Sequence, residues 1–141
     1  MNTLTICRPS HVITRSWGQS QFSDHVKYLE VTSRLDELQA WILGHPGDDL
    51  SVPALAGRMA MSPRTFARFF RSEIGETPAK FVGRARADRA LYKLEQTVLP
   101  IETIANECGF GNVERMRRTF QRLFDVSPHD YRARFRSTLL N

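Results

Sequence analysis

The feature that most constrains this chain is an internal repeat: the segment Ser51–Phe81 recurs as Pro100–Tyr131. Leu55-Ala56 matches Ile104-Ala105 at an offset of 49 residues, and after one inserted residue the offset becomes 50. Apolar, basic and capping positions then coincide, with Phe66, Arg68, Phe70, Thr77-Pro78 and Phe81 matching Met116, Arg118, Phe120, Ser127-Pro128 and Tyr131. Two copies are too few for a solenoid array. Each copy is therefore predicted to be a helix, a tight turn and a second helix that can enter a DNA major groove.

The second helix of the first copy, from Ser62 to Ile74, is predicted to have two distinct faces. Ser62 is a good N-cap, because its hydroxyl can accept a free amide proton of the first turn, and Pro63 falls where a missing N–H costs nothing. Apolar side chains form one stripe and arginines form another: Phe66, Phe69 and Phe70 against Arg64, Arg68 and Arg71. A solvated surface helix of another small domain would show the same pattern. The existence of the second copy favours contact with a polyanion.

The positive charge of the chain is concentrated in the repeated half. The net charge is +5, but residues 57–136 hold 16 Lys/Arg against 9 Asp/Glu, while residues 1–56 hold 4 against 6. Most of this charge is arginine, whose planar fork pairs bidentately with phosphate and with guanine edges. A basic surface placed on two similarly built helices is therefore stronger evidence for nucleic-acid contact than net charge alone.

The remaining periodicity predicts an all-α fold of about seven helices, with two helix-turn-helix subdomains joined by a long linker helix. Thr77-Pro78 is expected to cap that linker, which runs to about Glu95. Ser33 is expected to cap the first helix. Near the N-terminus, a short strand is expected at Thr3–Cys7 and a loop at Trp17–Phe22. The predicted organisation is a tail or linker over residues 1–32, a DNA-binding domain over residues 33–136 and a C-terminal tail over residues 137–141.

This pattern resembles the DNA-binding domain of the AraC-type (AraC/XylS) family of bacterial transcription regulators over about residues 34–135. The motifs that carry the resemblance are Leu55-Ala56, Met61-Ser62-Pro63-Arg64, Gly75-Glu76-Thr77-Pro78, Ile104-Ala105, Gly109-Phe110, Arg118-Thr119-Phe120 and Ser127-Pro128 with Tyr131-Arg132. A closer resemblance is to members with an amidotransferase-like sensor domain, because Arg15 and Gly18-Gln19-Ser20-Gln21-Phe22 look like the segment ahead of their DNA-binding domain. Only about thirty residues precede the first predicted helix. That sensor domain is therefore expected to be absent, which makes the chain a fragment of a longer regulator or a stand-alone DNA-binding protein.

Three residues depart from the family's pattern in the second copy. Glu114 stands where a small polar residue is frequent, and Met116 stands where phenylalanine is common. Asp125 replaces the commoner glycine at the end of the basic helix. Asp125 must either adopt a left-handed conformation at some cost or close the helix in another way.

The resemblance implies that the two basic helices enter successive major grooves, about 34 Å or 10 bp apart, and read an asymmetric site. Carried over position by position, the expected DNA contacts are Arg64, Thr65, Ala67, Arg68 and Arg71 in the first copy and Val113, Glu114, Arg117, Arg118 and Arg122 in the second. Thr65, Arg71 and Arg122 are expected at phosphates, Arg118 at a base edge or a phosphate, and the others at bases. Arginine favours guanine, and Glu114 can accept from a cytosine amino group. Arg86 and Arg89 of the linker helix are expected to form structural salt bridges instead.

The sequence does not indicate catalysis or membrane insertion. It has no Gly-rich phosphate loop and no metal-ligand triplet, and His11, His25, His45 and His129 are scattered. Cys7 and Cys108 lack metal spacing, and Cys108 matches Met59, which predicts a buried apolar role. No apolar run or signal-peptide pattern is present. We therefore expect a cytoplasmic, nucleoid-associated protein with no enzymatic activity, no cofactor, no metal and no small-molecule effector site.

Two functions remain open from the sequence. The first is a sequence-specific regulator whose partner is double-stranded DNA, with RNA polymerase as a further candidate partner. The second is an adaptor that pairs with a full-length regulator or with RNA polymerase and binds DNA weakly alone. The dependence of DNA binding on salt and on sequence separates the two.

Overall fold

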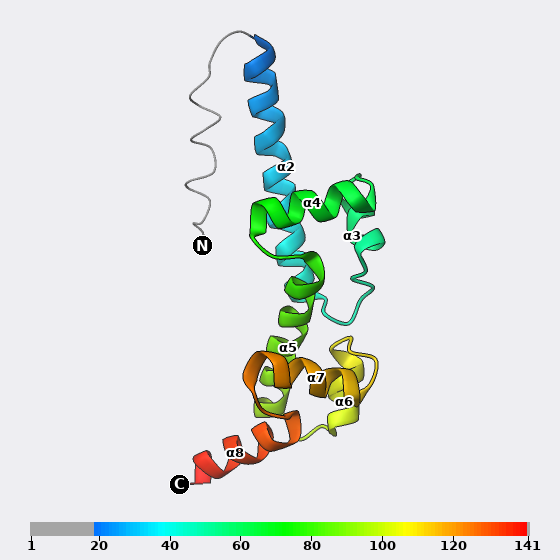
Figure 1. Ribbon diagram of the computed structural model, residues 1–141. Helices are drawn as coiled ribbons and strands as arrows, with labels where there is room; N and C mark the ends of the chain where they lie inside the picture. The colour runs from blue at the N-terminus through cyan, green and yellow to red at the C-terminus, as the bar shows by residue number, and fades with distance from the viewer. Residues whose placement is uncertain (1–18, 141) are drawn as a thin grey trace. The chain divides into compact units, whose positions relative to one another are not determined.

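The computed structural model describes residues 19–140, with side chains from Phe22 onward. Seven α-helices occupy this range (Figure 1): α2 (Gln19–Gly44), α3 (Val52–Arg58), α4 (Pro63–Ile74), α5 (Pro78–Gln96), α6 (Ile101–Glu107), α7 (Val113–Phe124) and α8 (Pro128–Leu140). No strand occurs within residues 19–140. The predicted all-α fold of about seven helices is therefore confirmed. The strand expected at Thr3–Cys7 lies outside the described residues.

Helix α2 corrects the prediction for the N-terminal region. It runs without interruption through Ser33, so Ser33 is not an N-cap, and Gln19–Phe22 is helical rather than a loop. The physical reason is that neither Gly nor Pro occurs between Gly18 and Gly44, and an internal serine lowers helix stability by only about 0.5 kcal/mol. The neighbouring Thr32 hydroxyl donates back to backbone carbonyls one turn earlier, a common arrangement inside helices.

The chain divides into two parts after Glu37, and the second, residues 38–140, is compact. The repeated segments both lie in the second part. The predicted domain boundaries after residues 32 and 136 stay predictions, and α8 extends past the second of them to Leu140.

The first helix-turn-helix subdomain consists of α3, α4 and the loop of residues 45–50 that precedes them. Both helices begin at a capping serine, as predicted for Ser62: the Ser51 hydroxyl accepts from the Ala54 amide at 3.4 Å, and the Ser62 hydroxyl accepts from the Thr65 amide at 3.2 Å. Phe66 and Phe70 are fully buried, and Phe69 between them is half-buried. The aromatic stripe is therefore core and leaves the arginine face exposed.

The second subdomain consists of α6, α7 and α8. Asn112 caps α7 with its side-chain oxygen, which accepts from the Arg115 amide at 2.8 Å. Its core is a cluster of buried side chains from α5 and from the second copy: Ala87, Ala90, Leu94, Ile104, Ala105, Cys108, Phe110, Met116 and Phe120. Tyr131 of α8 packs against this cluster and donates its hydroxyl to the Glu95 carboxylate. Met116 thus fills the place of Phe66 without leaving the core.

Helix α5 is the predicted linker and contacts both subdomains. The Thr77 hydroxyl caps it, and it packs against α4 near its start and against α6, α7 and α8 further along. Neither Arg86 nor Arg89 forms a salt bridge with another described residue, contrary to the prediction. Arg86 donates to the backbone carbonyls of Pro46 and Asp48, and the Arg89 guanidinium lies 5.6 Å from the Tyr92 ring centre.

Two turns place a left-handed residue at equivalent positions in the two copies but differ in the residue type. The turn between the helices has Ala60 (φ 57°) in the first copy and Gly109 (φ 87°) in the second. The end of the basic helix has Gly75 (φ 93°) in the first copy and Asp125 (φ 59°) in the second. Asp125 therefore adopts the left-handed conformation, one of the two outcomes expected from the sequence. Its side chain accepts a 3.0 Å hydrogen bond from Gln121.

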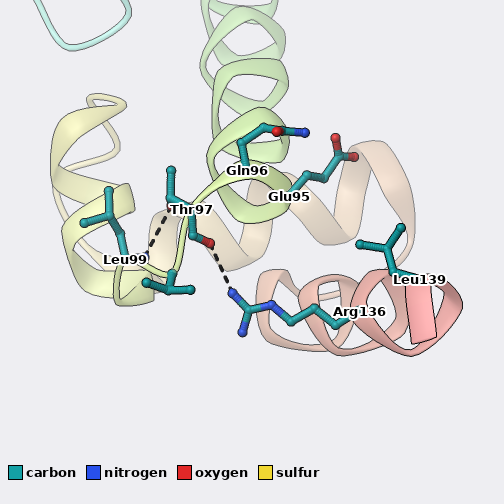
Figure 2. A pocket seen from close by; sticks show the side chains of 7 residues that line it. Glu95, Gln96, Thr97, Leu99, Arg136 and Leu139 are labelled. Atoms are coloured by element: carbon teal, nitrogen blue, oxygen red, sulfur yellow. Dashed lines mark hydrogen bonds between the residues drawn. The ribbon is translucent and has the colours of Figure 1, made fainter.

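The C-terminal end of the second subdomain is tied to the connection that precedes α6. Arg136 of α8 donates to the Thr97 carbonyl at 3.1 Å, and Arg132 donates to the Leu99 carbonyl at 2.6 Å. An open hollow of about 620 Å³ lies beside this contact, and its lining includes Val98 and Leu139. Both of these side chains are mostly exposed. Figure 2 shows the contact between Arg136 and Thr97 at this hollow.

Candidate nucleic-acid interface

The exposed face of α4 carries uncompensated positive charge. Arg64, Arg68 and Arg71 are exposed, and no ion pair joins any of them to another residue between positions 22 and 140. Thr65 is exposed beside them, and Ala67 is half-buried between them. The five residues predicted in this helix thus lie on one accessible surface, opposite the buried phenylalanines. Because Ser62 caps the helix with its hydroxyl, this surface begins at a helix N-terminus, where backbone amides favour anions.

The exposed face of α7 carries an ion-pair network that the sequence did not predict. The Glu114 carboxylate accepts two hydrogen bonds from Arg117, at 3.0 and 2.8 Å, and one from Arg118 at 2.9 Å. All three side chains are about half exposed or more, with Arg118 at 71%. Glu114 therefore compensates part of the charge that α7 presents to solvent.

The network changes the acidity of its members. Hydrogen bonds from Arg117 and then Arg118 lower the pKa of the Glu114 carboxyl from 4.5 to about 2. The same contact raises the pKa of Arg117. Glu114 is therefore ionised throughout the physiological range, and Arg117 holds its charge.

The offset of 50 residues places the two surfaces in direct correspondence. Arg68 corresponds to Arg118, but Arg64 corresponds to Glu114, so the charge is reversed in the first turn of the helix. Val113 of α7 is half-buried, and Arg122 is exposed at the far end. The ten predicted contact residues therefore divide between two helices, and only those of α7 include an acidic group.

Arg115 is an exposed residue in the first turn of α7 that the sequence analysis omitted. It occupies the position equivalent to Thr65, which was predicted to contact phosphate. The offset of the repeat was sufficient to find it. Its guanidinium extends the basic face of α7 toward the capped N-terminus.

The described residues hold neither a metal site nor a membrane-spanning helix. Within residues 22–140 no group of three or more His, Cys, Asp or Glu side chains is placed to hold a metal ion. No helix between residues 19 and 140 combines the length and the hydropathy needed to cross a membrane. Cys108 is fully buried, as predicted, and burial raises the pKa of its thiol to about 11. A buried, protonated thiol contributes to core packing and does not act as a nucleophile.

Comparisons with known sequences match the repeated half of the chain. Residues 55–134 match the model of a family described as a helix-turn-helix domain. The HTH-type transcriptional regulator Rv1931c of Mycobacterium tuberculosis is 45% identical over 92 residues, which are 65% of this chain and 36% of that protein. The HTH-type transcriptional activator RhaS of Citrobacter koseri is 32% identical over 100 residues, 71% of this chain and 36% of its own length. The matched region thus spans about a third of each relative.

Solved structures share the arrangement of helices. The DNA-binding domain of AdpA, a global transcriptional factor solved in complex with a target DNA, superimposes with a TM-score of 0.70 at 36% identity. That match covers 74% of this chain and 94% of the AdpA chain. A regulator of Chromobacterium violaceum with an AraC-type DNA-binding domain superimposes with a TM-score of 0.66 at 27% identity, covering 74% of this chain and 93% of its own.

Proposed function

Because this chain belongs to the AraC-type family of helix-turn-helix transcription regulators, we propose that it binds duplex DNA at specific sequences through α4 and α7. The family is one of transcription regulators and not of enzymes, in agreement with the sequence analysis. The observation that carries the proposal is the pair of equivalent helices. Each has its aromatic or apolar stripe buried, its arginine face exposed and its N-terminus capped by a side chain.

The two helices are of the size that a major groove accepts. Each has 12 residues and is therefore about 18 Å long at 1.5 Å per residue. When two such helices lie in successive grooves on one face of DNA, their centres are separated by one helical turn, about 34 Å or 10 bp. Since the two surfaces differ in sequence, one chain would read two unlike half-sites.

The contacts divide by the chemistry that each side chain offers. Arg64 and Arg68 of α4 are free to make bidentate contacts with guanine, and Ala67 offers a methyl group to thymine. Thr65 and Arg71 lie toward the edges of this surface and are assigned to phosphates. On α7 we assign Val113 and Arg117 to bases, Arg118 to a base edge or a phosphate, and Arg122 to a phosphate.

Glu114 adds a condition to reading by α7. While its carboxylate accepts from Arg117 and Arg118, it cannot accept in full from a cytosine amino group. Binding at the matching site would therefore exchange these intrahelical hydrogen bonds for contacts with bases. At a mismatched site the arginines stay paired with Glu114, which favours discrimination over affinity.

The test is a selection from random duplex DNA with the purified chain, followed by binding measurements on the enriched sites across a salt series. We expect two unlike half-sites about 10 bp apart. Arg64→Ala should relax the preference in one half-site and Arg117→Ala in the other, each by roughly tenfold in discrimination.

The matched control is Arg134→Ala, which removes one exposed positive charge from α8, outside the proposed interface. It should lower affinity slightly and equally for all sequences. Binding that falls with salt to the same extent for every sequence would reject specific recognition and leave only backbone electrostatics. That result would support the adaptor function, which the known relatives do not favour.

The proposed location of the chain and its proposed contact with RNA polymerase both depend on specific DNA binding. A chromosomal regulator acts in the cytoplasm at the nucleoid, and we propose that location for this chain. Contact with RNA polymerase stays a prediction, to be tested by whether the chain increases polymerase binding at a promoter that carries its selected site.

A further inference from the structure

The loop of residues 45–50 in the first subdomain touches the turn after α6 in the second, backbone against backbone. A Cβ added to Gly47 would lie 2.6 Å from the Glu107 carbonyl oxygen, and a Cβ added to Gly109 would lie 2.2 Å from the Pro46 carbonyl oxygen. Carbon and oxygen atoms do not approach so closely without displacement. The contact therefore depends on glycine at both positions, one from each side.

Arg86 fills the seam between this loop and this turn. From α5, its Nε donates to the Pro46 carbonyl at 2.9 Å and its Nη2 donates to the Asp48 carbonyl at 3.2 Å. The same Nε would lie 2.7 Å from a Cβ at Gly109, so the guanidinium also borders the turn of the second subdomain. The side chain is partly buried, and this burial lowers the pKa of Arg86, yet a guanidinium remains charged. Its hydrogen bonds to the two carbonyls are charge-assisted and correspondingly strong.

The second subdomain contains the equivalent of this arginine without the seam. Arg136 lies 50 residues after Arg86, and Thr97 lies 49 residues after Asp48, as the repeat requires. Arg136 Nη2 donates to the Thr97 carbonyl at 3.1 Å, just as Arg86 donates to Asp48. Binding the preceding loop is thus a property of both copies. Contact with the other subdomain belongs to Arg86 alone of this pair.

We propose that Arg86, with Gly47 and Gly109, locks the two subdomains at one relative position and so determines the spacing between half-sites without touching DNA. This inference rests on the proposed function of α4 and α7. The two subdomains are connected twice: through helix α5, which packs on both, and through the seam, where they touch directly. Because of this second connection, one subdomain cannot rotate about α5 unless the contacts of the seam break. Arg86 is therefore a positioning residue.

Spacing is a sensitive readout because one added base pair moves a half-site by about 3.4 Å and rotates it by roughly 34°. Binding is measured on duplexes that carry the selected half-sites at their natural separation and at separations longer or shorter by one and two base pairs. We expect the unmodified chain to lose about tenfold or more in affinity for a shift of one base pair. Arg86→Ala should bind the natural site more weakly but reduce this spacing penalty to about threefold or less.

Arg136→Ala is the matched control, because it removes the same side chain from the equivalent contact. It should retain the full spacing penalty. Arg86→Lys keeps the charge but has no fork to span two carbonyls, so it should give an intermediate penalty. If Arg86→Ala does not fold, as judged by circular dichroism, the comparison is made between Arg86→Lys and Arg136→Lys.

A second measurement does not need DNA. Spin labels are attached to cysteines introduced at the exposed Ser72 of α4 and Glu102 of α6, in a background with Cys7→Ser, and their distance distribution is recorded by pulsed electron resonance. We expect one narrow distribution for the unmodified chain and for Arg136→Ala, and a broad one for Arg86→Ala. A narrow distribution for Arg86→Ala, together with an equal loss of affinity at every spacing, overturns the lock. If the unmodified chain has no specific site, the proposed function fails, and the distance distribution alone decides on the lock.

Discussion

The two helix-turn-helix subdomains share one scaffold and present opposite charge at the same point. Buried positions correspond at offsets of 49 and 50: Ala56 and Ala105 are fully buried, and so are Phe70 and Phe120. On the exposed face, Arg64 of α4 corresponds to Glu114 of α7. The arginines of α4 are open to solvent, whereas two of those in α7 are held by that carboxylate. Packing therefore constrains the interior of each copy, while the surface is free to diverge, and the divergence is electrostatic.

The difference predicts a division of labour between the helices. An uncompensated arginine gains from any phosphate, so α4 would supply affinity that depends strongly on salt. An arginine that must leave a carboxylate gains only where the new partner is better, so α7 would supply discrimination. The first copy would then bring the chain to DNA, and the second would test the sequence.

The largest effect on this comparison is expected from exchanging the residues of the two inner turns. Gly109→Ala should lower the free energy of unfolding by about 3–4 kcal/mol, because it adds a left-handed alanine and a Cβ that meets the Pro46 carbonyl. Ala60→Gly should raise it by roughly 0.5 kcal/mol, since glycine adopts the same φ without strain. Urea denaturation measures both. If both substitutions change the free energy of unfolding by the same amount and in the same direction, the two turns do not differ in strain or in crowding.

The next effect concerns the charge reversal itself. Glu114→Gln should release Arg117 and Arg118 and raise affinity for non-specific duplex DNA roughly three- to tenfold at low salt, with a steeper salt dependence. Discrimination between the selected site and other DNA should fall. Glu102→Gln, which removes an exposed carboxylate from α6, is the matched control for net charge. If both variants tighten binding equally, the effect is general and the network on α7 has no special role.

A smaller effect is expected at the ends of the two basic helices. Asp125→Gly should stabilise the chain by about 0.5 kcal/mol, because it relieves a left-handed aspartate while losing one exposed hydrogen bond to Gln121. The reverse exchange, Gly75→Asp, should destabilise it by about 1 kcal/mol. Thermal unfolding of the two variants provides the comparison. Destabilisation by Asp125→Gly would mean that the aspartate side chain contributes more than its backbone strain.

The smallest effect is a shift in titration. Arg117→Ala should raise the pKa of Glu114 from about 2 toward its usual 4.5, because the first of its two hydrogen-bond partners is lost. The folded-state pKa lies below the unfolded one, so the network stabilises the folded chain fully above about pH 4.5 and loses this contribution as the pH falls toward 2. Carboxyl chemical shifts followed by NMR report the pKa directly. An unchanged pKa in Arg117→Ala would assign the shift to Arg118.

Most of the fold was predictable because its signals are local. Ser62 and Thr77 begin their helices as expected, since the side-chain oxygen of each accepts from the backbone amide three residues later. The prediction that Ser33 begins a helix was wrong because serine also occurs inside helices. No helix-breaking residue precedes Ser33, so α2 continues through it. Local chemistry thus identifies helix starts only where Gly, Pro or a change of period also marks an end.

Two sets of contacts were not predicted: those of Arg86 and those of Glu114. Arg86 was expected to find a carboxylate, but its partners are backbone carbonyls about forty residues earlier, and any residue type supplies those. The pairing of Glu114 with Arg117 and Arg118 was visible in principle, since spacings of three and four residues bring side chains together on a helix. The contact residues of the interface came from the family resemblance and from the repeat, which would also have pointed to Arg115.

The seam between the subdomains joins the loop of one copy to the turn of the next, which makes it a heterologous contact. A heterologous contact that is repeated builds a closed ring or an open filament. At the C-terminal end, Arg136 donates to the preceding connection as Arg86 does (Figure 2), but Gln96 occupies the position equivalent to Gly47. In the first copy, Ala60 occupies the position equivalent to Gly109. The seam therefore depends on a pair of glycines, and neither the C-terminal connection nor the first turn repeats its half of that pair.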